Sequence, residues 1–131
     1  MAGPVRDSDA MIAGMRPQLV PGAVVFAVAQ ADEMSALWAE ARALIREAEG
    51  VTAVLPADHP AAPPTAPQFR QITLGVLSAL DGVGLTAAVA TTLAEAQIPC
   101  NVIAGFHHDH IYVPKADADR ALALLIARAQ A

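Results

Sequence analysis

Residues 68–114 decide the fold expected for this chain: QFRQITLGVLSALDGVGLTAAVATTLAEAQIPCNVIAGFHHDHIYVP. Apolar and polar residues alternate over 71–76, which is typical of a half-buried strand. The segment 85–96 then carries one apolar stripe at helical spacing, formed by Leu85, Ala88, Val89, Leu93 and Ala96. Pro99 ends this helix. Apolar strands are expected at 101–106 and 110–113, joined by a polar turn.

A second helix is expected to follow this stretch. Its apolar stripe lies within 118–129, and Asp117 and Asp119 complement the positive end of the helix dipole. Strand, Gly-containing turn, helix and two strands in this order resemble an ACT domain, a small module that senses amino acids. The resemblance implies an α+β, ferredoxin-like βαββ(α) antiparallel sheet with helices on one face. One strand is missing, and the candidates are residues 23–29 or a strand of a second subunit.

The N-terminal half has a weaker pattern. Residues 7–15 predict a short helix, and the run AVVFAVA at 23–29 predicts a buried strand. Residues 34–55 fit either a helix or a hairpin that turns near Gly50. We favour a short helix over 35–41 and a hairpin over 43–55, because the related proteins have a hairpin there. Trp38, the only tryptophan, is expected to be a buried anchor.

The proline-rich segment that follows predicts an extended linker. We therefore expect three parts: an ACT-like half over residues 1–60, a linker over 61–67 and an ACT domain over 68–131. The resemblance carries most of the prediction for the first half.

Composition excludes several classes of function. The 131 residues have a net charge of -5 and only eight basic residues, which are scattered, so a nucleic-acid partner is not expected. The N-terminus lacks the apolar core of a signal peptide, and no apolar stretch is long enough to span a membrane. We expect a cytoplasmic protein. Cys100 is the only cysteine, which excludes an internal disulfide, and we expect it to be a packed thiol rather than a nucleophile.

The turn before the helix at 85 is the main candidate for a ligand site. Glycines let a backbone approach a ligand closely, and the first N–H groups of a helix have no acceptor within it. Together with the helix dipole they suit a carboxylate, and Asp81 could meet an ammonium group. The alternative is an ordinary turn in which Asp81 only caps the helix.

The resemblance adds the start of the second strand to this site. The contacts that it implies are Asp81, Gly82, Val83, Gly84, Leu85, Thr86, Asn101, Val102 and Ile103. It implies no catalytic residue and no cofactor. The resemblance also implies a homodimer, and a missing edge strand, which leaves backbone groups unpaired, is consistent with it.

The cluster His107–His110 allows further interpretations. His108 and His110 share one face of a strand, so they could bind a metal with Asp109, contact a ligand, or belong to a polar turn. A metal-dependent enzyme is therefore the third hypothesis for the chain. The first is an amino-acid sensor without catalysis, and the second is a ligand-free interaction module.

Overall fold

The computed structural model describes residues 3–131 and contains two compact units. The larger unit holds the chain up to Pro21 together with Arg70–Ala131, and the smaller unit is Gly22–Phe69. Strand β1 (Pro17–Ala29) runs through the boundary, so each unit uses one part of it. The hydrogen-bonded strand order is β2-β3-β1-β4-β6-β5.

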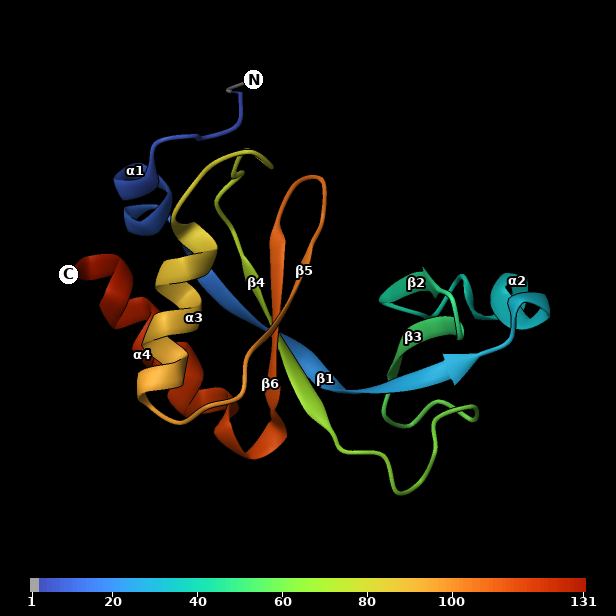
Figure 1. Cartoon of the computed structure of the whole chain (residues 1–131). Coiled ribbons are helices and arrows are strands. Elements are labelled where there is room, and N and C mark those ends of the chain that lie inside the picture. The colour runs from blue at the N-terminus through green and yellow to red at the C-terminus, as the bar shows by residue number, and fades with distance from the viewer. Residues whose placement is uncertain (1–2) are drawn as a thin grey trace. The chain divides into compact units, whose positions relative to one another are not determined.

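The larger unit is an α+β, ferredoxin-like sheet with helices on one face, as the sequence predicts. Its elements besides β1 are α1 (Ser8–Ala13), β4 (Phe69–Leu74), α3 (Leu85–Glu95), β5 (Asn101–Ala104), β6 (Asp109–Pro114), η2 (Lys115–Asp117) and α4 (Ala118–Gln130). Helices α3 and α4 lie against the sheet formed by β4, β5 and β6 (Figure 1). The expected strands and helices of residues 68–131 are thus confirmed.

One continuous core joins these helices to the sheet. Leu85, Val89 and Leu93 of α3 are buried in it, and Ala121 and Leu125 enter from α4. Ile72, Leu74, Ile111 and Val113 complete it from β4 and β6. Burial of an aliphatic side chain of this size contributes about 1.5–3 kcal/mol, so the apolar stripes of the two helices fix which faces they turn to the sheet.

The first part of β1 supplies the strand that is missing from residues 68–131. At its start, the N–H of Gly75 donates to Arg16 O at 3.0 Å and the N–H of Val76 donates to Met15 O at 3.2 Å. The strand is longer than the expected 23–29 and begins at Pro17, since a strand tolerates proline as its first residue. Residues 24–29 pair with β3, so the candidate strand 23–29 completes the sheet only through its N-terminal extension.

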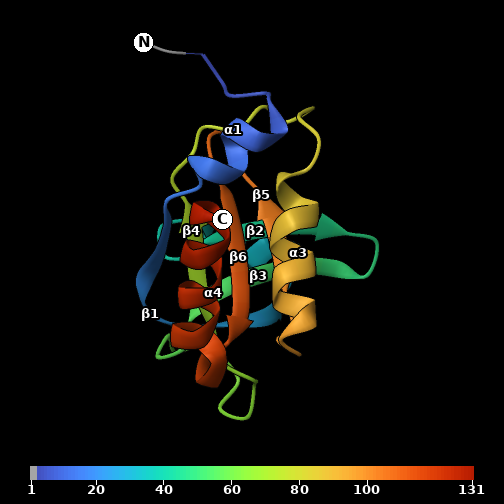
Figure 2. The same ribbon diagram turned by 90° about the vertical axis from the view of Figure 1, so that its left-hand side faces the viewer.

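Helix α1 covers one end of the helical layer. Asp7 caps it by accepting the N–H of Ala10 at 2.9 Å, and Met11 and Ile12 are buried. Figure 2 shows α1 beside the start of α3 and the C-terminal end of α4, both of which it contacts. The N-terminal residues therefore form part of the larger unit.

The smaller unit consists of a hairpin, one part of β1 and a single helical turn. Strands β2 (Ala43–Glu47) and β3 (Gly50–Pro56) form the expected hairpin, and β3 also pairs with β1. Helix α2 (Met34–Leu37), preceded by η1 (Ala31–Glu33), is shorter than the expected 35–41. Leu37 packs with Val25, Val51 and Leu55 in a separate core.

Two expectations for this unit are wrong. The side chain of Trp38 is 76% exposed, because Leu37 takes the inward position at the end of the one-turn helix. The proline-rich segment is a series of turns rather than extended chain, with the N–H of Ala62 bonded to His59 O at 2.9 Å and that of Ala66 to Pro63 O at 3.1 Å. Ala62 and Ala66 also pack against the core, which holds the segment in place.

Candidate functional site

The start of α3 is an uncapped helix end. Gly84 precedes it with φ +116°, a conformation that favours glycine, and no side chain caps the helix. The first hydrogen bond of the helix runs from the N–H of Ala88 to Gly84 O at 2.9 Å. The N–H groups of Leu85 and Thr86 therefore have no acceptor within the helix, and the positive end of its dipole lies here.

Helix α1 approaches this turn closely. A Cβ atom on Gly82 would lie 3.1 Å from the Sδ atom of Met11, and one on Gly84 would collide with the Oγ atom of Ser8. The two glycines therefore make room for side chains of the same chain. Sequence reasoning assigned that space to a ligand.

A small cavity of about 120 Å³ remains at this corner. It is lined by Met11, Ser78, Ala79, Leu80, Gly82, Gly84, Leu85, Thr86, Ala104 and Asp109. The hydroxyl of Ser78 donates to Asp109 Oδ2 at 3.2 Å, which fixes the carboxylate at the wall. The cavity thus has a helix N-terminus, which favours an anion, and a carboxylate, which favours a cation.

Four of the expected ligand contacts line this cavity, namely Gly82, Gly84, Leu85 and Thr86. Asp81 does not line it. Its exposed carboxylate pairs with Arg6 across the surface. Val83 points into solvent with its side chain 80% exposed.

The start of β5 lies at the other end of that strand from the cavity. Asn101 is exposed and pairs with Tyr112, while Val102 and Ile103 are half-buried and pair with Ile111 and His110. Ala104, which pairs with Asp109, is the β5 residue that reaches the cavity. Within one chain the structure therefore does not bring Asn101, Val102 and Ile103 to the corner.

The two inner histidines of the cluster have partners within the chain. His108 Nδ1 lies 3.3 Å from Val76 O, and His110 Nδ1 lies 3.0 Å from Thr73 Oγ1 and 3.2 Å from Gln71 Nε2. The buried hydroxyl of Tyr112 donates to Gln71 Oε1 at 3.1 Å and extends this network. Burial lowers the pKa of His110, and the nearby His108 lowers it further, while Asp109 acts in the opposite direction. Over residues 3–131, no three His, Cys, Asp or Glu side chains are grouped so that they could hold a metal ion.

Sequence reasoning missed Ser8, Met11, Ser78 and Asp109 as neighbours of the corner. The last two could have been found from topology. A strand, a helix and the next strand place the turn after β4 and the turn after β5 at the same end of the sheet. Asp109 follows the second turn and is therefore close to the first. No signal in the sequence locates α1, which lies far from the turn along the chain.

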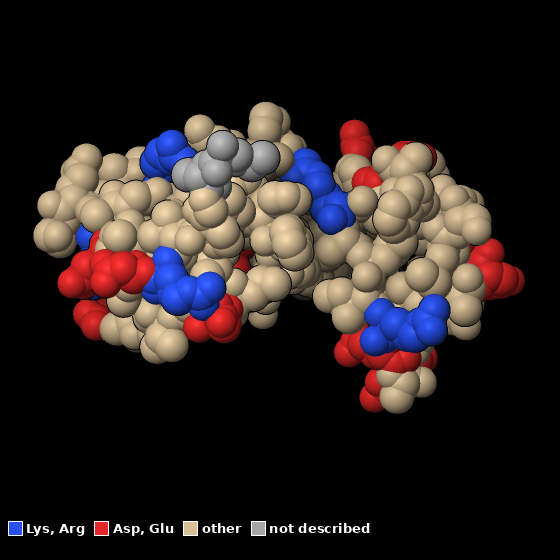
Figure 3. Space-filling view, turned by 90° about the horizontal axis from the view of Figure 1, so that it is seen from above, with Lys and Arg blue, Asp and Glu red and all other residues tan. Residues whose placement is uncertain are grey.

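The surface carries no concentrated basic patch on the face that Figure 3 shows. Lys and Arg appear there as separate groups, several with Asp or Glu beside them. Among the helices of residues 3–131, none has the length and apolar character needed to cross a membrane.

Comparisons with known proteins agree with this fold. A family model described as ACT domain matches residues 68–127, and a second one matches residues 4–67. A solved structure from Vibrio cholerae, described as a protein of unknown function and possible transport protein, shares 40% identity. Its TM-score is 0.76, over 89% of this chain and 92% of that chain. No curated protein sequence matches significantly.

More distant structures show the fold alone. A protein from Agrobacterium tumefaciens has 20% identity and a TM-score of 0.68, over 86% of this chain and 87% of that chain. The regulatory subunit of aspartate kinase from Thermus thermophilus, in its ligand-free form, has 8% identity and a TM-score of 0.62, over 88% of this chain and 97% of that chain. Since ACT models match both halves and a relative with 40% identity covers most of the sequence, the chain belongs to the ACT-domain family.

Proposed function

We propose that this chain is a regulatory module without catalysis of its own, and that it binds a small amino acid at the start of α3. The observation that carries the proposal is the cavity in which an uncapped helix end faces the carboxylate of Asp109. Family membership supports it, since ACT domains generally bind small molecules of this class.

A zwitterion fits the charges of the cavity. The ligand carboxylate would accept the N–H groups of Leu85 and Thr86, and its ammonium group would lie beside Asp109. The reverse orientation would bring two carboxylates together and is disfavoured. The cavity of about 120 Å³ has room for about four water molecules, so it admits glycine or alanine but only the head group of a larger amino acid.

The rest of the site would come from a second copy of the chain. In the proposed homodimer, Asn101, Val102 and Ile103 of one copy face the corner of the other, with Asp81, Val83, His108 or His110 near its edge. This arrangement would couple ligand binding to assembly, because only the dimer presents the whole site. No membrane or nucleic-acid partner is part of the proposal.

Calorimetric titration with each proteinogenic amino acid tests the proposal. We expect saturable binding of a small amino acid to the wild-type protein and a loss of about 10-fold or more in affinity in Asp109→Asn, because the ammonium group loses its charged partner. Asp58→Asn removes an exposed carboxylate in the smaller unit and is the matched control. Absence of heat and of thermal stabilisation with all of the amino acids would refute the proposal.

A second function is favoured by a separate observation. Leu80 and Phe106 are 66% and 78% exposed, and both line a surface pocket of about 410 Å³ that also contains Leu77. Exposed apolar groups of this kind mark association surfaces. In this alternative the chain is a dimerisation or interaction module without a ligand. Light scattering distinguishes the two, because the alternative requires Leu80→Lys to lower the mass of the particle in the absence of any amino acid.

A further inference from the structure

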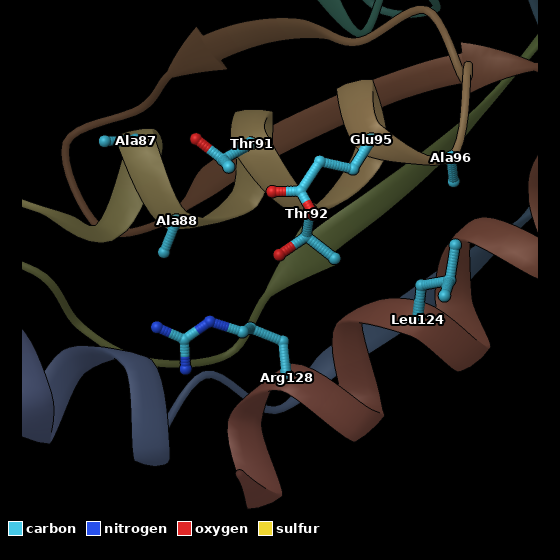
Figure 4. A pocket seen from close by; sticks show the side chains of 8 residues that line it. All are labelled: Ala87, Ala88, Thr91, Thr92, Glu95, Ala96, Leu124 and Arg128. Carbon is cyan, nitrogen blue, oxygen red and sulfur yellow. The ribbon is translucent and has the colours of Figure 1, made fainter.

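A groove of about 640 Å³ lies between α3 and α4 in the larger unit, away from the corner described above. Figure 4 shows the side chains that line it: Ala87, Ala88, Thr91, Thr92, Glu95, Ala96, Leu124 and Arg128. Arg120 fixes α3 to α4 at one end, because its Nη1 donates to Ala96 O at 2.9 Å. The volume is within the usual range for small-molecule sites.

Two opposite charges line this groove without neutralising each other. The side chains of Glu95, on α3, and Arg128, on α4, form no ion pair or hydrogen bond with another side chain of residues 3–131. Figure 4 shows Arg128 extending from α4 toward α3 and Glu95 lying along α3 beside Thr92, and both line the groove. An arginine and a carboxylate left unpaired in one groove present a separate site for each end of a dipolar molecule.

The remaining lining suits an aliphatic body. Ala88, Ala96 and Leu124 give an apolar surface, and the small alanines leave the space between the helices open. The hydroxyls of Thr91 and Thr92 can donate and accept hydrogen bonds within the same groove.

From this combination we infer a second small-molecule site, specific for a zwitterion with an aliphatic side chain. Arg128 binds the carboxylate of the ligand through two parallel N–H groups, and Glu95 binds its ammonium group. The aliphatic side chain lies on Ala88, Ala96 and Leu124. The site is independent of the cavity at the start of α3, which is too small for a whole leucine molecule.

Calorimetry with L-leucine as the probe tests this site. We expect saturable binding to the wild-type protein and weaker binding of N-acetyl-L-leucine and L-leucinamide, which lack the ammonium and the carboxylate respectively. Arg128→Gln and Glu95→Gln should each lower leucine affinity about 10- to 100-fold, since each removes a charge-assisted contact. Arg46→Gln and Glu49→Gln, two exposed charges of the smaller unit, are matched controls and should leave it unchanged.

The outcomes separate this site from the corner. Asp109→Asn should leave leucine affinity unchanged, whereas loss in Asp109→Asn with full binding in Arg128→Gln would overturn the inference. Absence of saturable leucine binding to the wild-type protein would also overturn it. A second copy of the chain that fills the groove would overturn the inference too. Such a dimer would be recognised by a smaller particle mass in Arg128→Gln than in the wild type. If Arg128→Gln does not fold by circular dichroism, the exposed Glu95→Gln carries the same test.

Discussion

The Oγ atom of Ser8 lies against Gly84, so close that it would collide with a Cβ atom at position 84. The contact joins α1 to the turn before α3, although the two residues are 76 positions apart along the chain. It explains why a glycine stands at position 84, one of the residues that line the corner cavity.

Replacing Gly84 should destabilise the protein in two ways. Gly84→Ala adds a side chain at φ +116° and a collision with Ser8. The backbone strain alone corresponds to about 1–3 kcal/mol of unfolding free energy, measured by urea denaturation. Adding Ser8→Gly to Gly84→Ala should restore the unfolding free energy that is lost through the collision, but not the part that is lost through backbone strain. Gly3→Ala, where nothing lies within 4 Å, is the control, and equal stability of Gly84→Ala and Gly3→Ala would contradict the prediction.

The buried hydroxyl of Tyr112 should contribute measurably to stability. Its bond to Gln71 Oε1 spans 3.1 Å between buried groups, and Tyr112→Phe leaves that acceptor with one donor fewer. We expect a loss of about 1–3 kcal/mol in unfolding free energy. A Tyr112→Phe variant as stable as the wild type in urea would show that the hydroxyl has no net role.

Stability should depend on pH through His110. Its pKa is lowered in the fold from 6.5, so the unfolded chain binds more protons between the two pKa values. The free energy of unfolding therefore rises with pH over this window. The contribution is complete above pH 6.5 and is lost as pH falls through the lower, folded pKa.

Two variants isolate this effect in urea denaturation between pH 5 and pH 8. In His110→Gln the free energy of unfolding should rise less steeply with pH than in the wild type. His107→Gln, which removes an exposed imidazole from the same turn, should leave this slope unchanged. An unchanged slope in His110→Gln would show that another group causes the pH dependence.

Cys100 should react slowly as a thiol. It is half-buried, and burial raises the pKa of its thiol, so less thiolate is present at a given pH. At pH 8 we expect its reaction with a disulfide reagent to be several-fold slower in the native protein than in the urea-unfolded chain. Equal rates would mean that the thiol is fully accessible in the fold.

The sequence predicts the larger unit well because its signals are local. Alternation over 71–76 and the apolar stripe from Leu85 to Ala96 each identify an element, and Pro99 marks the end of a helix. The hairpin at 43–55 has a weaker local signal, since part of the same stretch also fits a helical period. Trp38 was expected to be buried because large aromatic residues commonly anchor a core, but its neighbour Leu37 takes the inward position of the one-turn helix.

The surroundings of the candidate site could not be predicted to the same extent. Turn chemistry identifies Gly82 and Gly84, but only the fold shows that Ser8 and Met11 lie against them. Asp81 looked like the carboxylate of the site from its position in the turn. Its pairing with Arg6 depends on the path of the N-terminal segment, which has no local signal.

The most direct test of the central claim, that a small zwitterion binds where α3 begins, is a titration of ¹⁵N-labelled protein with glycine and with alanine, followed by amide chemical shifts. The account predicts saturable shifts that are largest at Leu85 and Thr86 and that are lost in Asp109→Asn. Shifts confined to other parts of the chain, or no shifts up to millimolar concentrations of either amino acid, would contradict it.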